Sequence, residues 1–70
     1  MHTSTERLLE LMRWLSETAK SATEMYERFD GRTIASAERR GYMMLYSTAT
    51  GTFVMITDRG EAFVTLEGKL

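Results

Sequence analysis

The stretch DGRTIASAERRGYMMLY, residues 30–46, decides the fold. It opens with Asp30-Gly31, a turn pair, because Gly adopts the positive φ that other residues resist. Residues 32–40 then separate into an apolar and a polar face when they are projected at about 100° per residue. Gly41 is a natural helix stop, and the aromatic and apolar run 42–46 is typical of a strand. The stretch therefore predicts a helix that ends where a β-strand begins.

The two faces of the predicted helix at residues 32–40 differ in size and chemistry. The apolar side is small and predicts close docking on neighbouring helices; it consists of Ile34, Ala37 and Gly41. The opposite sector spans about 120° and is cationic and rich in hydroxyl groups. Its members are Arg32, Thr33, Ser36, Arg39 and Arg40.

Downstream, the runs at residues 42–46 and 52–56 predict an antiparallel hairpin, since residues 47–51 between them have turn composition. A short closing helix follows. Thr57 is its expected N-cap and Asp58 lies in the favourable first turn. Its expected packing stripe, ahead of Gly68, consists of Ala62, Phe63 and Leu66.

Upstream, two further helices are predicted, each with capping-box spacing at its start and apolar residues at i, i+3, i+4 and i+7. The first covers about residues 5–18 and the second about residues 22–29. The capping boxes are Thr3 with Glu6 and Ser21 with Glu24, and the two stripes are Leu8, Leu11, Met12 and Leu15, and Ala22, Met25, Tyr26 and Phe29.

Length and composition favour one small domain over residues 1–70, with an ordered core at about residues 5–66. The chain has 70 residues, of which 43% are hydrophobic and 27% charged, and its net charge is −1. The absence of Cys excludes disulfides and thiolate metal sites. No apolar run exceeds five residues, compared with the roughly 20 that span a bilayer. No signal-peptide pattern is present, and we expect a soluble, cytoplasmic domain.

The same composition argues against catalysis. His2 is the single histidine and lies at the terminus, so neither a Ser-His nor a Cys-His nucleophile pair can form with it. We expect no enzymatic activity, no cofactor and no bound metal. The aromatic side chains, and most of the six methionines, are expected in the core rather than at a nucleotide-stacking site. The aromatic residues are Trp14, Tyr26, Phe29, Phe53 and Phe63.

Three helices with a tight turn before the third, followed at once by a hairpin, form the order of a winged helix-turn-helix domain. The chain resembles small winged-helix transcription regulators of the multiple-antibiotic-resistance and phenolic-acid-decarboxylase repressor kind. The resemblance covers about residues 5–66 and depends on three segments. These are Ser21-Ala22-Thr23-Glu24-Met25-Tyr26, Arg40-Gly41-Tyr42-Met43 and Ile56-Thr57-Asp58-Arg59-Gly60, the last similar to the family's Leu-Thr-x-x-Gly step.

The resemblance implies an α+β winged helix whose residues 32–40 form a recognition helix in the DNA major groove. It implies DNA contacts from Arg32, Thr33, Ser36, Arg39 and Arg40, and from Thr48 and Thr50 at the wing. The expected function is a small, sequence-specific DNA-binding transcriptional regulator from a prokaryote or phage. The alternative interpretation of the arginines is an ordinary solvated helix face, and Arg59 could contact a phosphate or pair with Asp58 or Glu61.

Charge is distributed along the chain in a way that suits a nucleic-acid partner. Residues 1–30 hold four basic and six acidic residues, a balance of −2, whereas residues 31–60 hold four and two, a balance of +2. Three or four arginines give a monomer only weak DNA affinity at physiological salt, so we expect a homodimer. The alternative function is a protein–protein interaction module without DNA binding, such as a phage or mobile-element adaptor. Its contact surface would be the Met- and Tyr-rich hairpin or Trp14.

Overall fold

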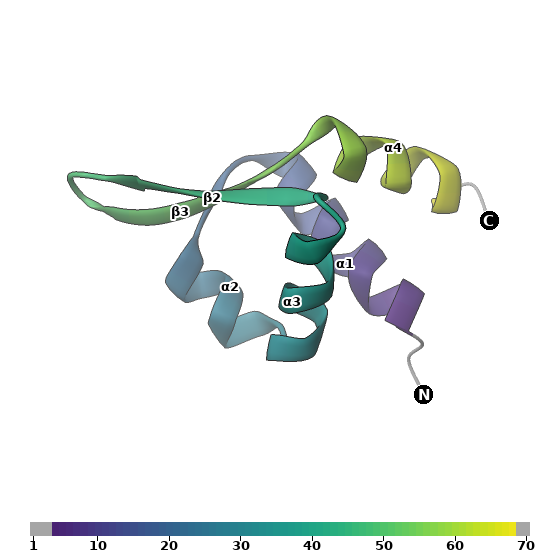
Figure 1. Ribbon diagram of the computed structural model, residues 1–70, viewed down its shortest axis with the longest axis horizontal. Helices are drawn as coiled ribbons and strands as arrows, with labels where there is room; N and C mark the ends of the chain where they lie inside the picture. The colour runs from purple at the N-terminus through teal and green to yellow at the C-terminus, as the bar shows by residue number, and fades with distance from the viewer. Residues whose placement is uncertain (1–3, 69–70) are drawn as a thin grey trace.

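The computed structural model describes residues 4–68, which form four helices and three strands of an α+β fold (Figure 1). The α+β class is confirmed, and the helices and hairpin follow in the expected order; Thr3 and His2 lie outside the described residues. In chain order the elements are α1 (Ser4–Glu17), β1 (Lys20–Ser21), α2 (Ala22–Arg28), α3 (Gly31–Arg39), β2 (Met43–Thr48), β3 (Gly51–Ile56) and α4 (Asp58–Glu67).

Side-chain caps fix where three of the helices begin. The Ser21 hydroxyl accepts a hydrogen bond from the Glu24 backbone N–H at 3.4 Å, and the Thr57 hydroxyl accepts one from the Gly60 N–H at 3.2 Å. Both N-caps were predicted and are confirmed. Asp30 caps α3, where the sequence had indicated only a turn. Each cap satisfies a backbone donor that the first helical turn leaves without an intrahelical partner.

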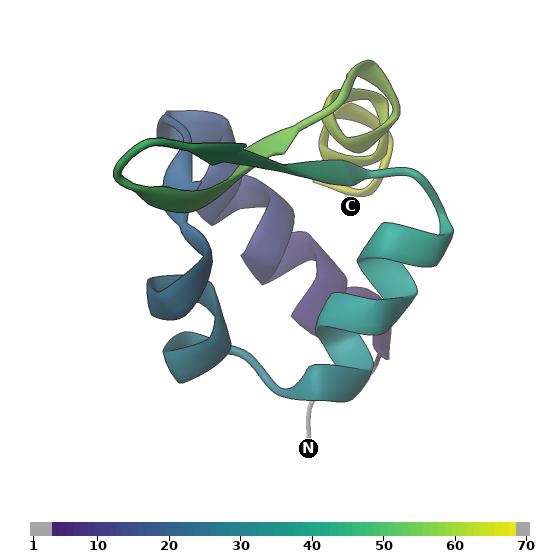
Figure 2. The ribbon, with the colours of Figure 1, turned by 60° about the vertical axis from the view of Figure 1, so that its left-hand side comes forward.

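The sheet is antiparallel, with the strand order β1-β3-β2. Strands β2 and β3 form the predicted hairpin, which projects beyond the helices in Figures 1 and 2. Strand β1 was not predicted, because two residues are too few to show alternation. It exists through its pairing with β3, where Lys20 lies opposite Val54 and Ser21 opposite Phe53.

The core lies where α1, α2 and α3 meet the inner face of the hairpin. Trp14 and Phe29 contribute a tilted ring pair to it, with centroids 5.6 Å apart. The α1 stripe expected from the sequence is confirmed, because all four of its members are buried. The largest fully buried side chains are Leu11, Met12, Leu15, Met25 and Val54.

Three core predictions are wrong: Phe53 lies outside the core cluster and stacks on Tyr46, and the other two concern Tyr26 and α4. Tyr26 is 58% exposed, because α2 ends at Arg28 and Phe29, in an extended conformation, fills the core position beside Met25. In α4 the expected stripe is displaced. Leu66 is 70% exposed and Ala62 is exposed as well, while α4 packs through Phe63 and Val64.

Gly60 explains the rotation of α4. A Cβ atom at this position would lie 2.6 Å from Ile56 Cγ1 and closer still to the carbonyl oxygen of Tyr42. The helix can approach the base of the hairpin this closely only where it has no side chain. Because Gly60 must face inward, residues three and four positions later, Phe63 and Val64, also face inward.

The hairpin is the part of the described chain with exposed apolar side chains on neighbouring strands. Met44 is 50% exposed, and Met55, opposite it on β3, is 42% exposed. Tyr46 is 36% exposed and stacks on Phe53 with ring centroids 5.9 Å apart. Met12, Met25 and Met43 are buried, so the prediction that most methionines lie in the core is confirmed for the described residues, and Met44 and Met55 are the exceptions. Within residues 4–68, no helix is long and apolar enough to cross a membrane.

Candidate nucleic-acid interface

The start of α3 is held by two hydrogen bonds that Thr33 donates to Asp30. The Asp30 carboxylate accepts hydrogen bonds from the Thr33 backbone N–H at 3.0 Å and from the Thr33 hydroxyl at 2.7 Å. These bonds, with a smaller contribution from the Arg7 guanidinium 3.8 Å away, lower the pKa of Asp30 below its ordinary value. The N-terminal turn of α3 is thus fixed against α1.

Thr33 does not face solvent, contrary to the sequence prediction. Thr33 is 8% exposed, and its hydroxyl donates a hydrogen bond to Asp30. The Thr33 side chain is therefore not presented to an external ligand. The projection placed Thr33 at the border of the polar sector, and the cap draws it inward. It joins Ile34 and Ala37 on the buried face of α3.

The exposed face of α3 is centred on Arg32, Ala35 and Arg39. Ala35 lies about one helical turn from each of the two arginines, at i+3 from Arg32 and i−4 from Arg39. Ser36 is half-buried at the flank, and its hydroxyl accepts a hydrogen bond from Arg40 Nε at 3.2 Å. The structure therefore brings four of the five predicted α3 residues to one side of the helix, and Ala35 is a member that sequence reasoning missed.

Arg32, Arg39 and Arg40 have no carboxylate partner among residues 4–68. Arg32 also lies in the first turn of α3, which contains no acidic residue. A cation at a helix N-terminus opposes the helix dipole by typically 0.3–1 kcal/mol, so helix stability does not account for an arginine there. The three guanidinium groups are available to an external anion.

Arg59 lies close to the C-terminal end of α3. A Cβ atom at Gly41 would stand 3.6 Å from Arg59 Cδ and 3.8 Å from its Nη1, so the arginine extends along the turn that follows α3. Gly41 has a φ of 75°, the left-handed conformation expected of a helix stop. Neither of the carboxylate partners considered from the sequence, Asp58 or Glu61, forms an ion pair with Arg59 in the described chain.

The hairpin tip carries Thr48 and Thr50, both exposed. Their hydroxyl oxygens are 3.0 Å apart in a hydrogen bond, and the Thr50 backbone N–H donates to Thr48 Oγ1 at 3.2 Å. Thr48 Oγ1 also lies 3.3 Å from the Gly51 carbonyl oxygen, to which it donates. The two hydroxyls shape the turn, and the tip holds no basic side chain.

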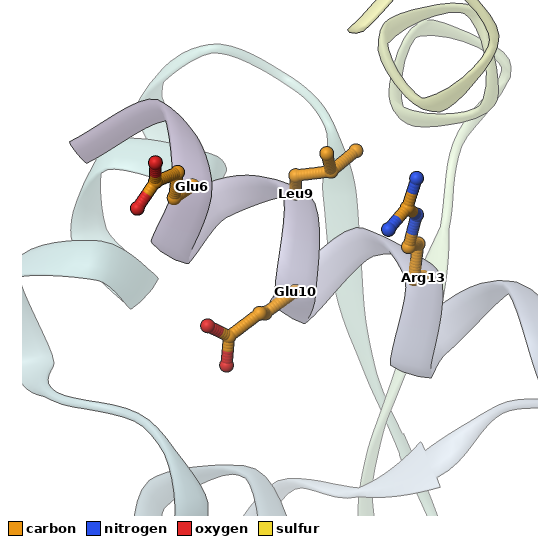
Figure 3. Close-up of a pocket in the computed structure, with 4 residues that line it drawn as sticks. All are labelled: Glu6, Leu9, Glu10 and Arg13. Carbon is orange, nitrogen blue, oxygen red and sulfur yellow. The ribbon is translucent and has the colours of Figure 1, made fainter. Parts of the chain in front are cut away.

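A separate hollow of about 250 Å³ lies on the outer side of α1, lined by Glu6, Leu9, Glu10 and Arg13. Figure 3 shows Leu9 and Arg13 directed toward α4 and Glu10 directed away from them. Glu10 accepts a hydrogen bond from Arg7 at 2.9 Å. The polar groups do not converge on one point, and residues 4–68 contain no group of three His, Cys, Asp or Glu residues that could hold a metal. The exposed face of α3 is therefore the candidate site.

Comparison with protein-family models, curated proteins and solved structures finds no match to this chain.

Proposed function

We propose that this chain is a winged helix-turn-helix DNA-binding regulator, with α3 as its recognition helix and the β2–β3 hairpin as its wing. The observation that carries the proposal is the exposed face of α3, where Arg32, Arg39 and Arg40 have no internal carboxylate partner. Arginine binds phosphates and reads guanine edges through bidentate hydrogen bonds. Ser36, at the same face, can donate to a phosphate, and Thr48 and Thr50 would do so on exchanging the hydrogen bonds that their hydroxyls make within the turn.

The element order supports the wing assignment. A third helix followed directly by a hairpin, with a short strand between the first two helices completing the sheet, is the arrangement of a winged helix. As a regulator, the protein would act in the cytoplasm on double-stranded DNA. It would act as a homodimer. The three or four arginines of one copy neutralise few phosphates and give only weak binding at physiological salt, and a second copy doubles the number of contacts.

The test is a salt titration of binding to random duplex and to the DNA upstream of the gene, using fluorescence anisotropy. We compare wild type with Arg32→Gln/Arg39→Gln/Arg40→Gln. The triple variant should bind the duplex more weakly, and its slope of log K against log salt should be shallower by about 2–3. Retention equal to wild type would overturn the proposal.

A matched control separates local contacts from net charge. Thr5→Glu/Ser16→Glu/Thr65→Glu changes the net charge by the same amount at exposed positions on α1 and α4. This control should keep the wild-type slope within about one contact. An equal loss in both variants would mean that total charge, and not the α3 face, governs retention.

The second candidate is a protein-binding module that does not bind DNA. It is favoured by the exposed Met44, Tyr46 and Met55 on a hairpin without charged side chains. A partner recovered by the purified, nuclease-treated protein and lost on Met44→Lys would support this candidate. Preferential retention of the upstream duplex would support the first.

A further inference from the structure

Strand β2 is an open edge of the sheet. The strand order is β1-β3-β2, so β3 is the one strand beside β2 in the described chain. The carbonyl oxygen of Tyr42 accepts a hydrogen bond from the Thr57 N–H at 3.0 Å, in the same register as the β2–β3 ladder. Backbone groups alternate in direction along an antiparallel strand. It follows that Met43, Leu45 and Ser47 direct their N–H and C=O groups away from β3, toward the open edge.

This edge lacks the features that prevent strands from pairing. Exposed edges are usually protected by proline, by charged side chains or by a bulge. The chain has no proline, and none of residues 41–57 is charged, although 27% of the whole chain is. The pairing of β2 with β3 continues without a bulge from Met43 to Thr48.

We propose that a second copy of this chain pairs with β2, strand to strand and antiparallel. Leu45 then lies opposite Leu45 of the second copy, because this register uses all three residues whose backbone groups face the edge. A two-fold axis normal to the sheet relates the copies, so their outer faces form one surface. The inference supplies the contact surface for the homodimer and rests on the proposed function only in having two copies act together.

The outer face of β2 is complementary to itself in this register. Met44, 50% exposed, comes opposite Tyr46 of the second copy, and Tyr46, 36% exposed, comes opposite Met44 of the second copy. Directly opposed side chains on one face interact most closely, and a thioether against an aromatic ring is a favourable pair. No charge is buried, because both strands are uncharged. A partner strand with charged side chains would lose their hydration here without any group to pair with them.

The size of the contact sets its strength. Strand β2 has six residues, against about 20–30 residues on each side of a standard stable interface. We therefore expect a weak dimer, with a dissociation constant between about 10 µM and about 1 mM. Such a dimer would be populated when two copies bind adjacent DNA half-sites.

Sedimentation equilibrium without DNA, up to about 1 mM protein, tests the proposal. Ser47→Pro should remain monomeric, because proline removes an outward N–H and leaves the β2–β3 ladder intact. Ser47→Ala is the matched control, since it loses the same hydroxyl contact with Thr52 but keeps the N–H. It should associate as wild type does. A wild-type chain that stays monomeric, or a Ser47→Pro chain that associates equally well, overturns the proposal and leaves the edge to a different strand.

A charge pair tests the register independently of proline. Tyr46→Glu should weaken association at least about tenfold, and Met44→Lys/Tyr46→Glu should restore it, because lysine and glutamate then face each other twice across the contact. Thermal unfolding of each variant checks that the fold is retained. A double variant that associates no better than Tyr46→Glu overturns this register and the proposal with it.

The two proposals fail separately. Arg32→Gln/Arg39→Gln/Arg40→Gln should associate like wild type, because none of these residues lies in β2. If wild type associates but retains no DNA, the regulator proposal fails and the dimer stands. If it retains DNA as a strict monomer, the dimer fails and the regulator proposal stands.

Discussion

Three of the four basic side chains in the α1–α2 region, all but the exposed Arg13, are used differently from those of α3. In the first region Arg7 lies over the Phe29 ring at 5.2 Å, while Lys20 and Arg28 lie over Trp14 at 5.3 and 5.1 Å. Arg7 and Lys20 also have carboxylates within 4.0 Å, as Arg7 with Glu10 at 2.9 Å shows. The arginines of α3 contact neither a ring nor a carboxylate in the described chain. The amino-acid composition does not distinguish these residues. Their surroundings in the structure show which cations support the fold and which are available to a ligand.

The largest expected effect is on the aromatic support of the first region. Trp14→Ala removes a ring that is 8% exposed and contacts Phe29, Lys20 and Arg28. The free energy of unfolding should fall by about 3–5 kcal/mol, measured by urea denaturation with circular dichroism. Trp14→Phe keeps a ring and should lose less. An unchanged denaturation midpoint for Trp14→Ala would show that this cluster does not hold the fold.

The next effect concerns α3 and should appear in binding rather than in stability. Arg39→Gln should reduce the slope of log K against log salt by about 0.9 and leave the free energy of unfolding within about 0.5 kcal/mol. Arg32→Gln should behave in the same way, and salt titrations with urea denaturation measure both quantities. A loss of stability above about 1 kcal/mol would place these arginines among the structural ones.

Arg28→Gln is the counterpart in the first region and should show the opposite pattern. Loss of the guanidinium over Trp14 should lower the free energy of unfolding by about 0.5–1 kcal/mol, and the salt slope of DNA binding should stay at the wild-type value. The same two measurements apply. If the slope of log K against log salt fell by about 0.9, the amount expected for one phosphate contact, the distinction between the two regions would be lost.

The smallest effect is a pH dependence at Asp30, where the two regions meet. Its pKa is lowered in the folded chain, first by the hydrogen bonds from Thr33. A lowered folded pKa gives a stabilisation that is complete above the unfolded pKa and is lost as the pH falls through the folded one. The urea concentration at the denaturation midpoint should therefore decrease as the pH is lowered below 3.8, the ordinary pKa of this group. Asp30→Asn keeps an N-cap and should remove this part of the pH dependence, and an unchanged profile would contradict the assignment.

Periodicity predicted the long elements because burial repeats along them. The stripe of Leu8, Leu11, Met12 and Leu15 identified α1, and two aromatic and β-branched runs on either side of a turn segment identified the hairpin. Periodicity could not predict β1, which arises only from pairing with β3, a segment more than 30 residues later. It also misplaced Tyr26, since α2 has seven residues and Phe29 leaves the helix before completing the stripe.

The candidate site was predictable in composition but not in detail. Helical projection placed Arg32, Ser36, Arg39 and Arg40 on one face, as the structure does. It misassigned Thr33, because a capping bond to Asp30 depends on where the helix begins. The absence of carboxylate partners for these arginines among residues 4–68 is a property of the three-dimensional arrangement and has no signal in the sequence.

The role of Gly60 limits what the segment Ile56-Thr57-Asp58-Arg59-Gly60 can indicate about function. Because the base of the hairpin excludes a Cβ atom at this position, the glycine is required by the closure of α4 on the hairpin, whatever the protein binds. Thr57 is likewise committed to the fold, since its hydroxyl donates to the Gly41 carbonyl oxygen at 2.6 Å and caps α4. A search that used this segment as a signature would retrieve chains that share this joint, including those with no affinity for DNA. Selecting among them by activity would require a second filter on the residues at positions 32, 35 and 39.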